Sequence, residues 1–134
     1  MTDLELMQLA VEAREMAYAP YSGFRVGAAL LAKSGKVYKG CNVENAAYSP
    51  TNCAERTALF KAVSEGEREF VAIAIVGGMY ENIADFCAPC GVCRQALAEF
   101  CDKDFRLVLG NPKNIKTYTS EEILPFSFGK ADLE

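Results

Sequence analysis

Three cysteines and one glutamate stand in two short clusters whose residue types could bind a metal ion and use it. Cys53 and Glu55 lie within SPTNCAERTAL, and Cys90, thirty-seven residues after Cys53, lies with Cys93 in PCGVCRQ. Two thiolates on one tetrahedral zinc ion are ~3.8 Å apart. Positions i and i+3 of a helix place Cβ atoms ~5–6 Å apart, so two cysteines at this spacing can chelate one ion. The clusters therefore predict a single zinc site.

The choice of ligands is not settled by spacing alone, because Cys87 forms a second C-x-x-C with Cys90. The residues that flank Cys90 and Cys93 favour this later pair, together with Cys53. Cys101 could close the site as a fourth thiolate, but it lies two helical turns beyond Cys93, too far to reach the same ion. We therefore expect three thiolates and one open position, which is typical of catalytic zinc.

Glu55 is predicted to act beside the metal and not as a ligand. Side chains at i and i+2 lie on different faces of a helix, so Glu55 and Cys53 are not expected to bind the same ion. A carboxylate next to a metal-bound water is what general acid–base catalysis requires. A glutamate in a first turn more often only stabilises the helix dipole, but its place in the sequence CAER favours the catalytic role.

Composition limits the class of protein and of partner. With 134 residues, 51% hydrophobic and 24% charged, residues 1–134 are expected to form one domain. A net charge of −4 without a run of Lys or Arg argues against a nucleic acid polymer, and the absence of His excludes histidine-based triads and metal sites. No apolar run is long enough to span a membrane, and the first residues are acidic, so we expect a cytoplasmic protein with reduced cysteines.

The elements around the clusters are predicted from capping, turn and periodicity signals. The first half of the chain is predicted to form a helix from the capping box at Thr2 to before Pro20, strands over 25–32 and 36–43 around the turn Ser34-Gly35, and a helix over 54–65. A buried strand over 70–76 and a loop from Gly77 to Asp85 follow. The last elements are a helix from the second cluster to about Cys101, strands over 105–109 and 115–119, and a short helix capped by Thr119. Both clusters then begin a helix, where the dipole stabilises a thiolate. This order predicts an α/β protein with helices on both faces of a sheet.

Several motifs resemble one enzyme family. Cys53-Ala54-Glu55 with Pro89-Cys90-x-x-Cys93 is similar to the zinc deaminase pattern, with Cys in place of the commoner His. The motifs Tyr21-Ser22-x-Phe24-x-Val26-Gly27-Ala28, Gly40-Cys41-Asn42-Val43-Glu44-Asn45-Ala46-Ala47-Tyr48, Cys53-Ala54-Glu55-Arg56-Thr57-Ala58 and Pro89-Cys90-Gly91-x-Cys93-Arg94-Gln95 resemble the short, homotetrameric cytidine deaminases of pyrimidine salvage. The resemblance covers nearly the whole chain, and the loop over 77–86 and the tail around Phe126 to Phe128 depart from it.

This resemblance implies a fold and a reaction. The fold is a three-layer α/β/α sandwich with a central mixed sheet of about five strands. The reaction is hydrolytic deamination of cytidine and 2′-deoxycytidine to uridine and 2′-deoxyuridine with release of ammonia. One zinc ion per subunit is implied, held by Cys53, Cys90 and Cys93. Zinc-bound hydroxide attacks C4 of the base, and Glu55 shuttles protons to N3 and to the departing amine.

The resemblance also implies a substrate site completed by neighbouring subunits. The residues implied to contact substrate are Asn42 and Glu44 at the ribose hydroxyls, Phe24 beside the base, Ala54, Tyr48 and, from a neighbouring subunit, Phe128 with Phe126 as its alternative. Without the family pattern, Asn42 would be a strand-end turn residue and Phe24 a core aromatic.

Arg56 is predicted to act on the metal ligands. Zn²⁺ with three thiolates has a net charge of −1, which opposes formation of a hydroxide nucleophile. A guanidinium that donates hydrogen bonds to the thiolate sulfurs would withdraw negative charge from the metal.

Other classes of protein remain open at this stage. The spacing C-x-x-C-x-x-C is part of a ferredoxin cluster motif, although position 97 is Leu where the fourth cysteine should stand. A non-catalytic zinc-stabilised binding module would leave Glu55 without a role. Deaminases of related bases or of nucleoside analogues share the zinc motif, so the choice of cytidine depends on Asn42, Glu44 and the flanking motifs.

Overall fold

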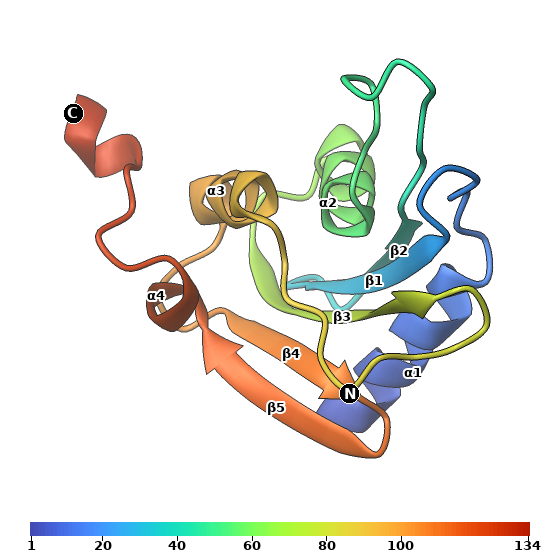
Figure 1. The fold of residues 1–134 in the computed structure, drawn as a ribbon. Helices are drawn as coiled ribbons and strands as arrows, with labels where there is room; N and C mark the ends of the chain where they lie inside the picture. The colour runs from blue at the N-terminus through green and yellow to red at the C-terminus, as the bar shows by residue number, and fades with distance from the viewer.

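The computed structural model describes residues 1–134 and contains one five-stranded mixed sheet with helices on both faces (Figure 1). The strand order is β2-β1-β3-β4-β5, with β1 antiparallel to β2 and β3, β3 parallel to β4, and β4 antiparallel to β5. In chain order the elements are α1 Asp3–Arg14, β1 Phe24–Ala32, β2 Val37–Cys41, α2 Ala54–Ser64, β3 Phe70–Met79, α3 Gly91–Phe100, β4 Arg106–Asn111, β5 Asn114–Thr119, α4 Ser120–Ile123 and a 3-10 helix, Lys130–Leu133. The predicted α/β fold with a mixed sheet of about five strands is confirmed.

The central strands are buried on both faces because successive side chains point to opposite helical layers. α1 lies on one face, and α2 and α3 lie on the other (Figure 1). The cluster beneath α1 consists of Leu6, Met7, Ala10, Ala29, Ala72, Ala74, Val76 and Val108. The larger cluster on the opposite face includes Leu30, Ile73, Ile75, Leu107, Leu59 of α2 and Leu97 of α3. These two cores make the three layers. None of the helices has the length and apolar character needed to cross a membrane.

Local signals correctly predict where most helices begin. Thr2 and Glu5 form the expected capping box at α1, and Thr119 and Glu122 form another at α4. Cys53 is the N-cap of α2 and Cys90 is the N-cap of α3, so each predicted cluster does begin a helix. Two of the predicted metal ligands, Cys53 and Cys90, therefore lie at the starts of two helices that share one face of the sheet.

Two predicted boundaries are wrong. The first helix ends at Arg14, well before Pro20, because the chain then leaves the helix axis and Tyr18 pairs with Val43 beside the sheet. The segment from Gly77 to Met79 was predicted as loop but continues β3, since it pairs with the start of β1, where Phe24 lies opposite Met79.

Close packing of α2 on β2 depends on Gly40. A Cβ atom at this position would lie 2.5 Å from the backbone nitrogen of Ala58 and 2.6 Å from the backbone oxygen of Ala54. Both are backbone atoms of α2, so the helix itself would have to move. Because α2 begins at Cys53, its distance from the sheet also sets the position of the first metal ligand.

We predict that Gly40→Ala lowers the free energy of unfolding by ~1–3 kcal/mol, as overpacked sites do, and also weakens zinc binding. The matched control is Gly129→Ala, where an added Cβ would have no atom within 4 Å and the φ angle of −154° is ordinary. Thermal or urea unfolding of both variants, with metal analysis, provides the test. Equal stability of the two variants would contradict the proposed packing constraint.

Candidate functional site

The thiols of Cys53, Cys90 and Cys93 converge where the first turns of α2 and α3 meet. The Sγ atom of Cys90 lies 3.6 Å from that of Cys53 and 3.4 Å from that of Cys93, and all three sulfurs lie within 4.8 Å of one another. These separations are close to the ~3.8 Å expected for thiolates on one tetrahedral zinc ion. Three soft sulfur ligands without a carboxylate in the group suit zinc and do not suit magnesium or calcium. The residues present therefore fit one zinc ion per chain.

The remaining cysteines lie outside this group, which resolves the choice that spacing left open. Cys87 is buried against the sheet, where a Cβ atom on Gly77 would come within 2.7 Å of its Sγ atom, and burial raises the pKa of its thiol to about 12. Cys101 follows the last turn of α3, and burial also raises its pKa to about 12. The later C-x-x-C pair supplies the thiols, and Cys101 is not a fourth member of the group.

The surroundings of the thiols stabilise negative charge unevenly. The pKa of Cys53 is lowered to about 5, first by a hydrogen bond from Cys93 and then by Arg56, whose Nη2 atom lies 3.4 Å from Sγ of Cys53. The same thiol–thiol contact raises the pKa of Cys93. The Nε atom of Arg56 is buried and has no hydrogen-bond partner in the protein. The guanidinium is thus aimed at the sulfur cluster and is not engaged by a carboxylate.

Glu55 is placed in the first turn of α2, one residue after Ala54, and both side chains are buried. The side chain of Glu55 is only 4% exposed, and burial raises the pKa of its carboxyl to about 7. Its carboxylate is not part of the group of potential metal ligands. The arrangement therefore places a proton-carrying group in the interior next to the ligand Cys53.

A cavity of about 340 Å³ is lined by Tyr21, Ser22, Glu44, Asn45, Tyr48 and Thr51. One oxygen of the Glu44 carboxylate accepts hydrogen bonds from the backbone N–H groups of Tyr21 at 3.0 Å and Ser22 at 3.1 Å, and the other accepts from the Ser22 hydroxyl. The Ser22 hydroxyl holds the pKa of Glu44 below its usual value. A fixed negative charge therefore borders this cavity. Ser22 was not predicted as a site residue, although it stands within the motif that contains Phe24.

Asn42 and Phe24 lie where the ends of β2 and β1 meet. The Oδ1 atom of Asn42 accepts a hydrogen bond from the Val26 backbone at 2.9 Å, and its Nδ2 atom donates to the Phe24 carbonyl at 2.8 Å. An amide side chain has two donor hydrogens and two acceptor lone pairs, so one donor and one acceptor position remain for a ligand. The side chain of Asn42 therefore links the end of β2 to the start of β1.

The aromatic residues expected at the substrate have different surroundings. Tyr48 lines the 340 Å³ cavity, is 75% exposed and has a left-handed φ of 64°. Phe128 is 58% exposed, and its carbonyl accepts a hydrogen bond from Gln95 of α3 at 2.8 Å. Phe126 borders a larger cavity of about 510 Å³ between α3 and α4. Neither cavity is lined by Glu55 or by any of the three clustered thiols.

Arg94 links the residue before Cys90 to the end of α4. Its Nε atom donates to the Pro89 carbonyl at 2.8 Å, and its Nη1 atom donates to the Ile123 carbonyl at 2.7 Å. The arginine thereby holds the residue before Cys90 against the end of α4.

Comparison with known proteins agrees with the site. Residues 1–109 match the family model described as the cytidine and deoxycytidylate deaminase zinc-binding region. The chain is 52% identical to cytidine deaminases of Halalkalibacterium halodurans, covering 96% of this chain and 95% of the relative, and of Sporosarcina psychrophila, covering 96% and 93%. The crystal structure of cytidine deaminase from Burkholderia pseudomallei superposes with a TM-score of 0.87 at 47% identity, covering 96% of this chain and all of the other.

We predict that Cys93→Ser weakens zinc binding by more than ~100-fold, because changes outside the ligand set alone cost ~10–100-fold. Cys87→Ser is the matched control, since it removes another buried thiol from the same motif. Zinc content after gel filtration should fall in the first variant and stay at one per chain in the second. Loss of zinc from both variants to the same extent would contradict the assignment of ligands.

Proposed function

The chain belongs to the cytidine and deoxycytidylate deaminase family and is a zinc-dependent enzyme that deaminates cytidine; we propose that one domain, residues 1–134, carries out this reaction on 2′-deoxycytidine as well. The products would be uridine or 2′-deoxyuridine and ammonia. The observation that carries the proposal is the buried carboxyl group of Glu55 in the first turn of α2, two residues after Cys53, one of three converging thiols.

Cys53, Cys90 and Cys93 would hold zinc, which supplies the Lewis acidity that makes a water molecule nucleophilic at neutral pH. The contribution of Arg56 is electrostatic. Three thiolates place three negative charges within a few ångströms, and the guanidinium 3.4 Å from Sγ of Cys53 offsets part of that charge. The Nε atom of Arg56 is buried and has no hydrogen-bond partner in the protein, so no other group draws the guanidinium away from the sulfurs.

Glu55 moves the protons of the reaction. In the proposed sequence its carboxylate takes a proton from the water that attacks C4 and delivers it to N3 of the base. A second proton then passes through Glu55 to the amino group, which leaves C4 as ammonia. One water molecule is consumed for each ammonia released. Burial of Glu55 keeps bulk water away from the carboxylate and so keeps these transfers between substrate and enzyme.

The nucleoside is proposed to bind across the junction of β1, β2 and α2. Glu44 and the remaining hydrogen-bonding positions of Asn42 would bind the sugar hydroxyls, and Phe24 would pack beside the base. Ala54 and Tyr48 would complete the contacts within the chain. The support is that Glu44 is held by three hydrogen bonds at the cavity, so its charge is already oriented before a ligand arrives.

We also propose a cytoplasmic homotetramer that serves pyrimidine salvage. In this assembly Phe128 of one subunit would cover the base in a neighbouring site, with Phe126 as the alternative. The support is the half-exposed ring of Phe128 on a backbone that Gln95 anchors to α3, the helix that provides two of the thiols.

Replacement of the catalytic carboxylate tests the mechanism. Glu55→Gln should retain zinc and the fold but lower kcat for cytidine by at least ~10²–10⁴-fold, because an amide cannot transfer the protons. Glu65→Gln, at the other end of α2, is the control and should have normal activity. An ultraviolet assay of both zinc-loaded variants provides the measurement. Near-normal turnover by Glu55→Gln would remove Glu55 from the mechanism.

Discrimination against phosphate tests the substrate site. The enzyme should prefer cytidine to cytidine 5′-monophosphate by at least ~10-fold in kcat/KM, because a phosphate near the ionised Glu44 is repelled and loses its hydration. The comparison needs the two substrates under identical pH and salt. Comparable efficiency on both would contradict a sugar pocket bordered by Glu44.

A further inference from the structure

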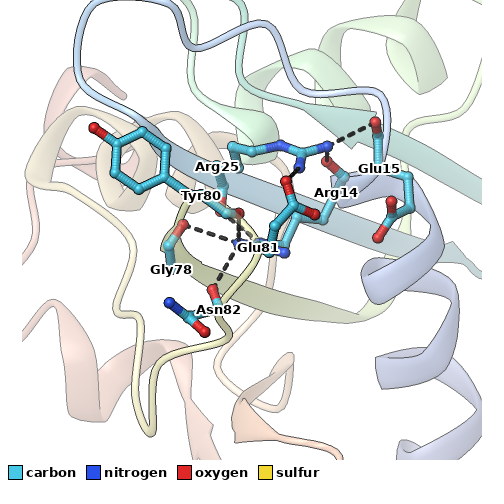
Figure 2. Close-up of polar contacts among 7 residues, drawn as sticks. All are labelled: Arg14, Glu15, Arg25, Gly78, Tyr80, Glu81 and Asn82. Atoms are coloured by element: carbon cyan, nitrogen blue, oxygen red, sulfur yellow. Dashed lines mark hydrogen bonds and ion pairs between the residues drawn. The ribbon is translucent and has the colours of Figure 1, made fainter.

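Arg14 is a buried cation whose side chain binds backbone carbonyls and no carboxylate. It is 2% exposed at the end of α1, and burial, followed by the nearby charge of Arg25, lowers its pKa. A buried charge is tolerated only when its hydrogen-bonding groups are satisfied. Figure 2 shows how carbonyl oxygens surround this guanidinium. Arg14 follows the buried Ala10 by four positions and so lies on the apolar side of α1.

Most of these carbonyls come from the end of β3 and the turn that follows it. The Nη2 atom of Arg14 donates to the carbonyls of Gly78 at 3.0 Å, Tyr80 at 2.7 Å and Asn82 at 2.7 Å, so its two hydrogens are shared among three acceptors. Its Nε atom donates to the Arg25 carbonyl at 2.9 Å in β1. The guanidinium therefore joins the end of α1, the start of β1 and the segment 78–82.

The start of this segment is also held by strand pairing, since Gly78 and Met79 pair with β1, and the Asn82 N–H donates to the Met79 carbonyl at 2.9 Å. Tyr80 has a left-handed φ of 49°, which is unfavourable for a residue with a side chain. Glu81 is exposed, and its only ion pair is the contact of 3.6 Å with Arg25. Three carbonyls that point inward toward one cation hold the segment in this conformation, and the loss of the cation would leave them unsatisfied.

The same segment supports the turn that precedes β1. The Tyr80 backbone N–H donates to the Gly23 carbonyl at 2.7 Å. The Tyr80 ring covers Gly23 so closely that a Cβ atom there would lie 2.7 Å from the ring. On the other side of this turn, Ser22 is hydrogen-bonded to the carboxylate of Glu44. The residues of the turn are thus held between Tyr80 and Glu44.

We propose that Arg14 is a positioning residue for the sugar side of the nucleoside site, acting through the segment 78–82 and the turn at Ser22–Phe24. This inference rests on the proposed binding of the sugar by Glu44. Arg14 does not touch the substrate. Its guanidinium fixes Tyr80, Tyr80 fixes Gly23, and the turn then fixes the orientation of Glu44 and the backbone of Phe24.

The test uses a conservative variant at each end of this chain of contacts. Arg14→Lys keeps the positive charge but replaces a planar fork of donors with one ammonium group, which cannot reach the same set of carbonyls. Tyr80→Asn removes the ring, while asparagine tolerates the left-handed backbone. The matched control is Arg106→Lys, because Arg106 pairs with Asp3 at 3.0 Å and joins the opposite end of α1 to the sheet.

Four quantities are measured on zinc-loaded protein. They are kcat and KM for cytidine, the ratio of kcat/KM for cytidine to that for 2′,3′-dideoxycytidine, and the hydrogen-exchange rate of the Tyr80 amide. In Arg14→Lys and Tyr80→Asn we expect KM for cytidine to rise roughly 10-fold with kcat within about twofold, as for a loss of ground-state binding. The substrate ratio should move toward one, because the dideoxy sugar lacks the hydroxyls whose recognition is impaired. The Tyr80 amide should exchange faster in Arg14→Lys and at the normal rate in Arg106→Lys.

Unchanged KM and unchanged substrate ratio in a folded Arg14→Lys enzyme would overturn the inference, as would a loss confined to kcat. If Arg14→Lys fails to fold, the same two quantities in Tyr80→Asn decide the matter. Inactivity of the unmodified enzyme toward cytidine is a different result: it would contradict the proposed function and, with it, the sugar site that this inference assumes.

Discussion

Two helices, α2 and α3, begin side by side on one face of the sheet, and the group of three thiols exists only because their N-termini meet. α2 and α3 both begin at a cysteine, and both are packed on the strands through the larger hydrophobic cluster. Three thiols converge only if both helices keep their distance from the sheet and from each other. Apolar burial thus determines the distances between the three thiols. The packing of α2 on Gly40 contributes to these distances because it sets the position of Cys53.

Acidic groups gather around the site, and cations and backbone hydrogen bonds hold the side chains near them. Three clustered thiols, the buried carboxyl group of Glu55 and the carboxylate of Glu44 are acidic groups in a protein whose net charge is already −4. Arg56 is the cation directed at the sulfurs, and it has no competing carboxylate partner. Elsewhere the ends of β1 and β2 are joined by side chains that bind backbone atoms: Asn42 clips the two strands, and Arg14 gathers carbonyls from the segment 78–82. The proposed sugar site is therefore organised by hydrogen bonds to the main chain.

The sequence by itself determined the features that follow local rules. Capping boxes at Thr2 and Thr119 mark real helix starts because a cap needs only residues three positions apart. The strand alternation and the order of elements were enough for the α/β sheet. The type of metal ligand could also be predicted from the sequence, because a chain without histidine offers only cysteine as a soft donor.

Only the tertiary structure decided the features that depend on pairing between distant segments. Cys87 and Cys93 stand at equal spacing from Cys90 and both are buried, but only Cys93 has its Sγ atom within 4.8 Å of those of Cys53 and Cys90. Gly77 and Gly78 are typical of a loop, yet pairing with β1 makes them strand. Arg14 lies in a helix that local rules extend to Pro20, and no local rule predicts that its guanidinium meets carbonyls sixty-four to sixty-eight residues away. Spacing along the chain fixes neighbours on one element, whereas burial and strand register depend on the whole fold.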